Sequence, residues 1–175
     1  MKGNYSNTKT NKHEGGEDYM NNLKEERRKK GKNVEMGYGG GERKQNGIYD
    51  SVVEMIKSNG KEVIEEDGVM PNPTVEKLNE GCRRARDGKV DLILAVGGGS
   101  VIDYAKAVSV SAHSEGDVWD KYFLRMEDVD NEIIPVGCVL TMVGTGSEMN
   151  GGAVITNHAQ KRKIGHVFGD NVFPK

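Results

Sequence analysis

The chain has 175 residues, enough to bury a sizeable core, and 35% of them are hydrophobic while 30% are charged. Its net charge of −2 provides no basic field, which argues against nucleic acid or an anionic membrane surface as a partner. No apolar run is long enough to span a bilayer and no signal peptide is recognisable, so we expect a cytoplasmic protein.

Residues 1–33 show almost no pattern of a hydrophobic core, and the stretch 24–32 is densely charged. Such a segment cannot bury enough apolar surface to offset the entropy of ordering it. We therefore expect a polar, poorly ordered segment over residues 1–33, followed by one α/β domain over residues 34–175.

A first strand is predicted at 34–38, although Glu35 and Gly37 interrupt a run that a buried parallel strand would keep apolar. Three glycines, Gly39, Gly40 and Gly41, follow directly. This succession of strand and glycine turn returns later in the chain.

The middle of the chain alternates between helix and strand patterns. An apolar stripe predicts a helix from Ile48 that ends at 58–60, and residues 62–65 predict a short strand. Asn72 followed by Pro73 predicts the N-cap and first residue of a second helix. Its buried stripe is expected to consist of Val75, Leu78, Cys82 and Ala85, with the helix ending at 87–88.

Residues 90–96 form an unbroken apolar run that predicts a strand buried on both faces. Gly97, Gly98 and Gly99 follow, and Ser100 is predicted to open a helix. A glycine turn at a helix N-terminus is a site for phosphate, because free N–H groups and the positive end of the helix dipole meet there. The alternative is that Ser100 and Asp103 form a capping box that needs no ligand.

Two further features follow along the chain. Residues 133–140 predict another buried strand, with Pro135 early in it, and the glycine- and hydroxyl-rich turn 141–150 comes next. Residues 153–156 and 163–167 predict a hairpin. The alternation of strands and helices is typical of a doubly wound, mostly parallel, Rossmann-like α/β sheet, in which both glycine-rich turns lie at the carboxyl edge of the strands.

Several of these motifs together resemble the iron-containing (group III) alcohol dehydrogenases, and within them the NAD(P)-dependent butanol dehydrogenases. The similarity runs from about residue 34 to the end of the chain. The matching segments are 38–41, 46–50, 71–73, 97–106, 116–120, 141–150 and 154–157. The resemblance implies the interconversion of a primary alcohol and its aldehyde by hydride transfer to or from a nicotinamide dinucleotide.

The resemblance also implies which residues touch the cofactor. The first glycine turn would lie near the adenosine ribose, and the hydroxyls of Thr141 and Thr145 would reach phosphate or nicotinamide. The expected cofactor-binding residues are Gly39, Gly40, Gly41, Glu42, Gly97, Gly98, Gly99, Ser100, Asp103, Thr141, Thr145 and Ser147.

Glu42 indicates NAD, because a carboxylate accepts a hydrogen bond from a ribose 2′-hydroxyl and repels a 2′-phosphate. NADP is the alternative, since Arg43 and Lys44 could serve that phosphate. A solvated cluster of charges without a ligand is the third interpretation.

In the resembling enzymes a second, helical domain holds Fe²⁺ or Zn²⁺ through one Asp and three His, all beyond the position that matches Lys175. The histidines here, His13, His113, His158 and His166, lack metal-ligand spacing. We therefore expect this chain to contain the cofactor half of such an enzyme, to lack catalytic and metal-binding residues, and to be inactive alone.

Two functional hypotheses result: an NAD(P)-dependent alcohol dehydrogenase represented by its N-terminal domain, or a non-catalytic nucleotide-binding remnant of a truncated gene. A glycerol dehydrogenase or dehydroquinate synthase relationship is a weaker third hypothesis, against which the 141–150 motif argues. Relatives commonly dimerise through N-terminal strands, so the resemblance offers a homodimer as a candidate assembly. Cys82 and Cys138 are expected to be buried thiols of a reducing compartment.

Overall fold

The computed structural model describes residues 33–39 and 47–175. The expectations for residues 1–32 and for Gly40, Gly41 and Glu42 lie outside the described residues. The strands are β1 (Asn33–Tyr38), β2 (Glu62–Glu66), β3 (Leu92–Gly97), β4 (Val136–Leu140), β5 (Gly152–Asn157) and β6 (Arg162–Val167). The helices are α2 (Ile48–Ser58), α3 (Val75–Asp87), α4 (Gly99–Ser111), a π-helix Trp119–Leu124, and two 3₁₀ turns, Ser147–Met149 and Asp170–Val172.

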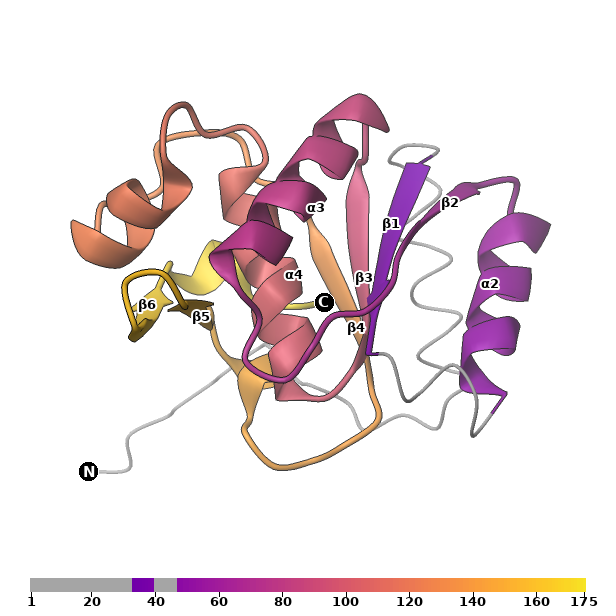
Figure 1. Cartoon of the computed structure of the whole chain (residues 1–175). Coiled ribbons are helices and arrows are strands. Elements are labelled where there is room, and N and C mark those ends of the chain that lie inside the picture. The colour runs from indigo at the N-terminus through magenta and orange to yellow at the C-terminus, as the bar shows by residue number, and fades with distance from the viewer. Residues whose placement is uncertain (1–32, 40–46) are drawn as a thin grey trace, which may run out of the picture. The chain divides into compact units, whose positions relative to one another are not determined.

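Four strands form a parallel sheet in the order β2-β1-β3-β4. Helix α2 lies on one face of this sheet, whereas α3 and α4 cover the other (Figure 1). Side chains of β1 alternate accordingly: Val34, Met36 and Tyr38 pack with α2, and the residues between them turn toward α3 and α4. The doubly wound α/β fold predicted from the sequence is confirmed.

The first strand forms despite its two interruptions, and it lies between β2 and β3. Gly37 is accommodated because the ring of Tyr104 on α4 fills the space beside it, with the nearest ring carbon 3.7 Å from where a Cβ would stand. Glu35 is 1% exposed, facing the α3–α4 layer. The prediction of a strand at 34–38 is confirmed, and the sheet buries a carboxyl group within it.

Helix α3 begins two residues later than the sequence predicted. Thr74 is the N-cap, and its hydroxyl accepts a hydrogen bond of 3.2 Å from the Lys77 backbone N–H. Asn72 instead has a positive φ of 57°, and the Pro73 carbonyl accepts from Thr156 N–H in the hairpin. The tertiary contact of Pro73 thus fixes the chain outside the helix, and the prediction of Asn72 as N-cap was wrong.

The buried stripe of α3 is as expected: the four predicted positions are at most 8% exposed. Strand β4 is shorter than predicted and starts after Pro135, whose carbonyl accepts from Ile93 N–H. Proline has no N–H to donate to the ladder, which explains why regular pairing begins only at Val136.

The predicted hairpin is confirmed as β5 and β6, an antiparallel pair outside the main sheet. Its inner side packs with α4 through Ala153 and Ile155, which are both almost completely buried. Trp119 is 2% exposed, stacks on Phe123 and donates through Nε1 to Gln160 Oε1 at 2.9 Å. Trp119 is therefore a packing residue. Within residues 33–39 and 47–175, none of the helices has the length and apolarity required to cross a membrane.

Candidate functional site

The carboxyl ends of β1, β3 and β4 meet at one edge of the sheet because the three strands are parallel and adjacent. The turn after β3 and the loop 141–150 after β4 touch there, since Thr141 N–H donates to the Gly97 carbonyl at 3.1 Å. Gly39, the described residue of the first glycine turn, lies beside Val101 at the start of α4. The structure thus brings together the segments that the sequence predicted to share one site.

The N-terminus of α4 points into this edge. Its N-cap is Gly98, the first helical residue is Gly99, and no side chain caps the end. The helix therefore begins one residue before Ser100, and the alternative of a Ser100–Asp103 capping box is wrong. N–H groups of a first helical turn have no acceptor within the helix, so they are available to an anion.

Gly98 and Gly99 differ in how closely their neighbours approach. Among the described residues, a Cβ on Gly98 would meet only the Met142 Cβ at 3.5 Å, an ordinary contact, and the backbone there is extended (φ −90°, ψ −169°). A Cβ on Gly99 would collide with the Thr145 side chain. The fold therefore requires glycine at 99, whereas position 98 leaves an open strip of backbone.

Loop 141–150 carries exposed side chains beside this strip. Thr145 is exposed and Thr141 half-buried. Met142 and Val143 are 70% and 83% exposed, and Met149 is 51% exposed. Hydroxyl groups and apolar surface next to free N–H groups suit a ligand that combines phosphate with a flat apolar ring.

The side chains of Asp103 and Ser147 form hydrogen bonds with other groups of the protein. Ser147 Oγ donates to Asp103 Oδ1, and the second carboxylate oxygen accepts from Val154 N–H at 3.1 Å. Both side chains are therefore engaged inside the protein. Whether they also contact a cofactor stays a prediction.

Lys106 is a residue that sequence reasoning missed. It is 0% exposed, and its Nζ lies 2.8 Å from both the carbonyl and the hydroxyl oxygen of Ser147. Burial lowers the pKa of Lys106, and the charge of Asp103 acts against that fall. The available signal was a lysine at position i+3 from Asp103, and it is the one charged side chain among the buried positions of this helix.

A second group of buried charges lies on the same face of the sheet, around Glu35. Burial raises the pKa of Glu35 to about 8, and the charge of Glu66 adds to the rise. Glu66 is fully buried but pairs with Lys77 and with Arg84, whose Nε is 2.8 Å from it. Among the described residues, neither carboxyl oxygen of Glu35 has a hydrogen-bond partner.

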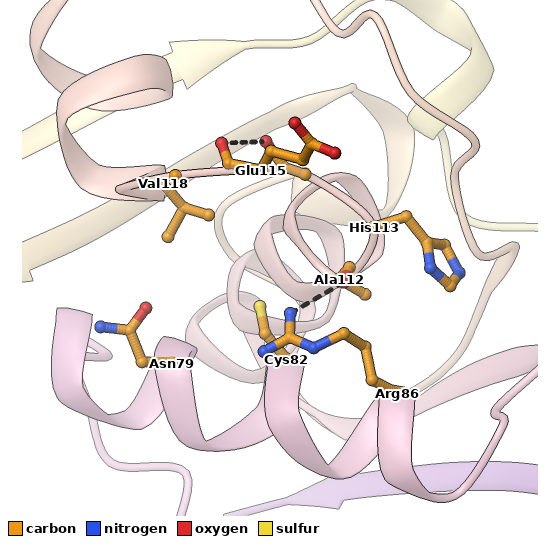
Figure 2. Close-up of a pocket in the computed structure, with 9 residues that line it drawn as sticks. Asn79, Cys82, Arg86, Ala112, His113, Glu115 and Val118 are labelled. Atoms are coloured by element: carbon orange, nitrogen blue, oxygen red, sulfur yellow. Dashed lines mark hydrogen bonds between the residues drawn. The ribbon is translucent and has the colours of Figure 1, made fainter.

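The pocket drawn in Figure 2 lies at the opposite end of α4, around Ala112, and has a volume of about 540 Å³. Asn79, Cys82 and Arg86 line it from α3 (Figure 2). The Arg86 guanidinium donates to the Ala112 carbonyl at 2.9 Å, so at least one of its N–H donors is already used within the protein. This pocket is separate from the glycine turn, because the whole of α4 lies between them.

No group of three or more His, Cys, Asp or Glu side chains capable of holding a metal ion occurs in the part of the chain that the structure describes. His113, His158 and His166 are thus not gathered into a metal site with such partners. His13 lies outside the described residues. The described residues do not fit the metal centre that the family resemblance implies for a second domain.

Comparison with known proteins gives the family. The family model described as iron-containing alcohol dehydrogenase matches residues 11–175. A probable NADH-dependent butanol dehydrogenase of Bacillus subtilis is 44% identical over 161 residues, covering 91% of this chain and 41% of that protein. An NADPH-dependent aldehyde reductase of Escherichia coli, YqhD, is 41% identical over 120 residues, covering 68% of this chain and 30% of that protein.

Solved structures agree with this relationship. The crystal structure of an NADH-dependent butanol dehydrogenase A from Thermotoga maritima has a TM-score of 0.81 and 43% sequence identity. It is matched over 89% of this chain and 39% of that chain. The present chain thus spans about two fifths of the length of the relatives to which it is similar.

Proposed function

Because this chain belongs to the iron-containing alcohol dehydrogenase family, we propose that it binds the dinucleotide of an NAD(P)-dependent alcohol dehydrogenase of the butanol dehydrogenase type. The cofactor is NAD, and the reaction interconverts a primary alcohol and its aldehyde. When the dinucleotide is bound, its nicotinamide ring is the group that accepts the hydride from the alcohol. The described residues support the proposed cofactor binding, and no group of three or more His, Cys, Asp or Glu among them could hold a metal ion.

The observation that carries the proposal is the open backbone at Gly98. Neither its φ and ψ nor its described neighbours require a glycine, since a Cβ would make only one ordinary contact with them. A glycine is useful there when a ligand must approach the backbone closely. The ligand that fits best is an anion, because the N–H groups of the first turn of α4 converge on the same place.

In this arrangement the N–H groups of Gly99 and Ser100 hold the pyrophosphate, and the Ser100 hydroxyl adds a donor. Thr141 and Thr145, on the loop that follows β4, supply hydroxyls to the phosphate or the nicotinamide amide. Gly39, beside Val101 at the start of α4, faces the adenosine ribose. Helix N-termini stabilise phosphate without a basic side chain, which agrees with the net charge of −2.

The preference for NAD rests on Glu42, which precedes Arg43 and Lys44 in the sequence. Some relatives are named for NADH and others for NADPH or NADP, so the family alone does not decide the question. We expect a lower Kd for NADH than for NADPH. Glu42→Ser should narrow or reverse the difference, because it removes the charge that repels a 2′-phosphate.

Calorimetric titration of the 175-residue chain with NADH tests the proposal directly. We expect binding in the micromolar range, and its loss in Gly98→Val, while circular dichroism and Tm stay close to those of the native chain. Gly165→Val on β6 is the matched control: a Cβ there lies 3.3 Å from Val154 Cγ2, well away from the glycine turn. A folded native chain without measurable binding would contradict the proposal, as would equal affinities in the native chain and Gly98→Val.

A further inference from the structure

We infer that buried Lys106 and Ser147, together with the partly buried Asp103, form a polar cluster that positions loop 141–150 against the glycine turn, so that they act on the cofactor through the loop instead of touching it. The inference rests on the proposed function, since the loop matters only if the dinucleotide binds beside it. It changes the expected role of Asp103 and Ser147 and adds Lys106.

The first step is the surroundings of the Lys106 ammonium. Its Nζ lies 2.8 Å from two oxygens of Ser147 and 3.2 Å from two of Asn150, the carbonyl and Oδ1. Asp103 Oδ1 is 3.5 Å away and provides the opposite charge. An ammonium group has three N–H donors, so these acceptors already exceed its capacity, and none remains for a phosphate.

The second step is the position of Asp103. One of its oxygens accepts from Ser147 Oγ in the loop and the other from Val154 N–H in β5. Asp103 on α4 is therefore hydrogen-bonded both to loop 141–150 and to the first strand of the hairpin. A carboxylate aimed at a pyrophosphate would repel it, whereas a carboxylate paired with Lys106 fixes the chain around it.

The third step connects the cluster with the ligand-binding side of the loop. Ser147 and Asn150 anchor the end of the loop on α4, and the Thr141 N–H anchors its start on Gly97. Thr145, between the two anchors, is held against Gly99. Without the buried anchor, the exposed half of the loop would have to be ordered when the ligand binds, which lowers affinity.

Three variants separate positioning from contact. Lys106→Met removes the charge and keeps the length, Ser147→Ala removes one hydroxyl, and Ser147→Thr keeps it. Each is compared with the native chain by NADH calorimetry, corrected for folded fraction, and by hydrogen exchange of the loop amides without ligand. Lys77→Met is the matched control, because it breaks the pair between Lys77 on α3 and buried Glu66 on β2 without touching the loop.

We expect faster exchange confined to residues 141–150 and about a tenfold higher Kd in Lys106→Met and Ser147→Ala. Ser147→Thr should restore both values, and Lys77→Met should lower Tm while leaving both unchanged. If Kd rises in Ser147→Ala but loop exchange stays at the native rate, Ser147 is a direct ligand and the inference is wrong. Faster exchange with a native Kd would also overturn it.

The outcomes for the two proposals differ. A native chain that binds no NADH refutes the proposed function and with it any effect of the cluster on cofactor affinity. A native chain that binds NADH, with Lys106→Met binding it equally well, refutes only the positioning role. If Lys106→Met does not fold, Ser147→Ala decides the question, because it deletes a single oxygen.

Discussion

A Cβ built on Gly99 would lie 2.3 Å from the Oγ1 of Thr145, far closer than two non-bonded atoms can approach. The two residues belong to the turns that follow β3 and β4, and the parallel pairing of these strands brings the turns together. Gly99 is thus required by the neighbouring loop, not by its own backbone angles. This contact sets how closely the loop approaches the N-terminus of α4.

The contact predicts an interaction between two substitutions. Gly99→Ala should destabilise the native chain by about 1–3 kcal/mol, because Thr145 must move away. In a Thr145→Gly background the same substitution should be neutral or stabilising, since alanine favours helix over glycine. Urea unfolding of the native chain, the two single variants and the double variant measures this cycle. If Gly99→Ala changes the free energy of unfolding equally in both backgrounds, Thr145 and its loop move away from position 99 at no measurable cost.

Glu35 predicts an unusual dependence of stability on pH. Burial raises its pKa to about 8, well above the 4.5 of an unfolded carboxyl. Between these two values the folded state holds a proton that the unfolded state has lost, so raising the pH favours unfolding. Relative to Glu35→Gln, the free energy of unfolding of the native chain should fall by up to about 1.4 kcal/mol per pH unit from about pH 5 to 8.

The measurement is chemical denaturation of both chains at several pH values across that range. Glu62→Gln, which alters an exposed carboxyl on β2, is the matched control and should keep the native slope. If the native chain and Glu35→Gln have parallel profiles, Glu35 is ionised in the folded state and has found a counter-charge.

Cys82 is expected to be unreactive in the folded protein. It is 2% exposed, and burial raises the pKa of its thiol to about 12, although it borders the pocket of Figure 2. A thiol reagent attacks the thiolate, so both effects slow the reaction. In Cys138→Ser, which leaves Cys82 as the one cysteine, a chromogenic disulfide reagent at pH 8 should label the protein only after denaturant is added. Rapid labelling of the folded variant would mean that the pocket opens to the thiol.

The Thr74 cap at the N-terminus of α3 is expected to contribute to stability. Thr74→Ala should lower the free energy of unfolding by about 1 kcal/mol, because the Lys77 N–H loses its acceptor. Thr74→Ser keeps the hydroxyl and should recover most of that loss, so the difference between the two variants isolates the hydrogen bond from the lost methyl group. Equal stabilities of the two variants would show that the hydroxyl contributes nothing.

Local patterns were sufficient for most of the elements. The apolar run before Gly97 predicted β3, and the spacing of Val75, Leu78, Cys82 and Ala85 predicted the buried face of α3, because both patterns report burial directly. Element boundaries were predicted less well. Pro73 and Pro135 are both held by backbone contacts to other parts of the chain, which the local sequence does not contain.

The sequence by itself determined the alternation of strands and helices, the two glycine-rich turns and the family to which they belong. Tertiary structure decided which groups share an environment. The parallel sheet placed Thr145 on Gly99 and buried Glu35 under α3 and α4. It also enclosed Lys106 with Ser147, which is 41 residues away in the chain. Such pairings depend on long-range packing, so the charge of a lysine or a glutamate in the sequence does not reveal whether water or another side chain will surround it.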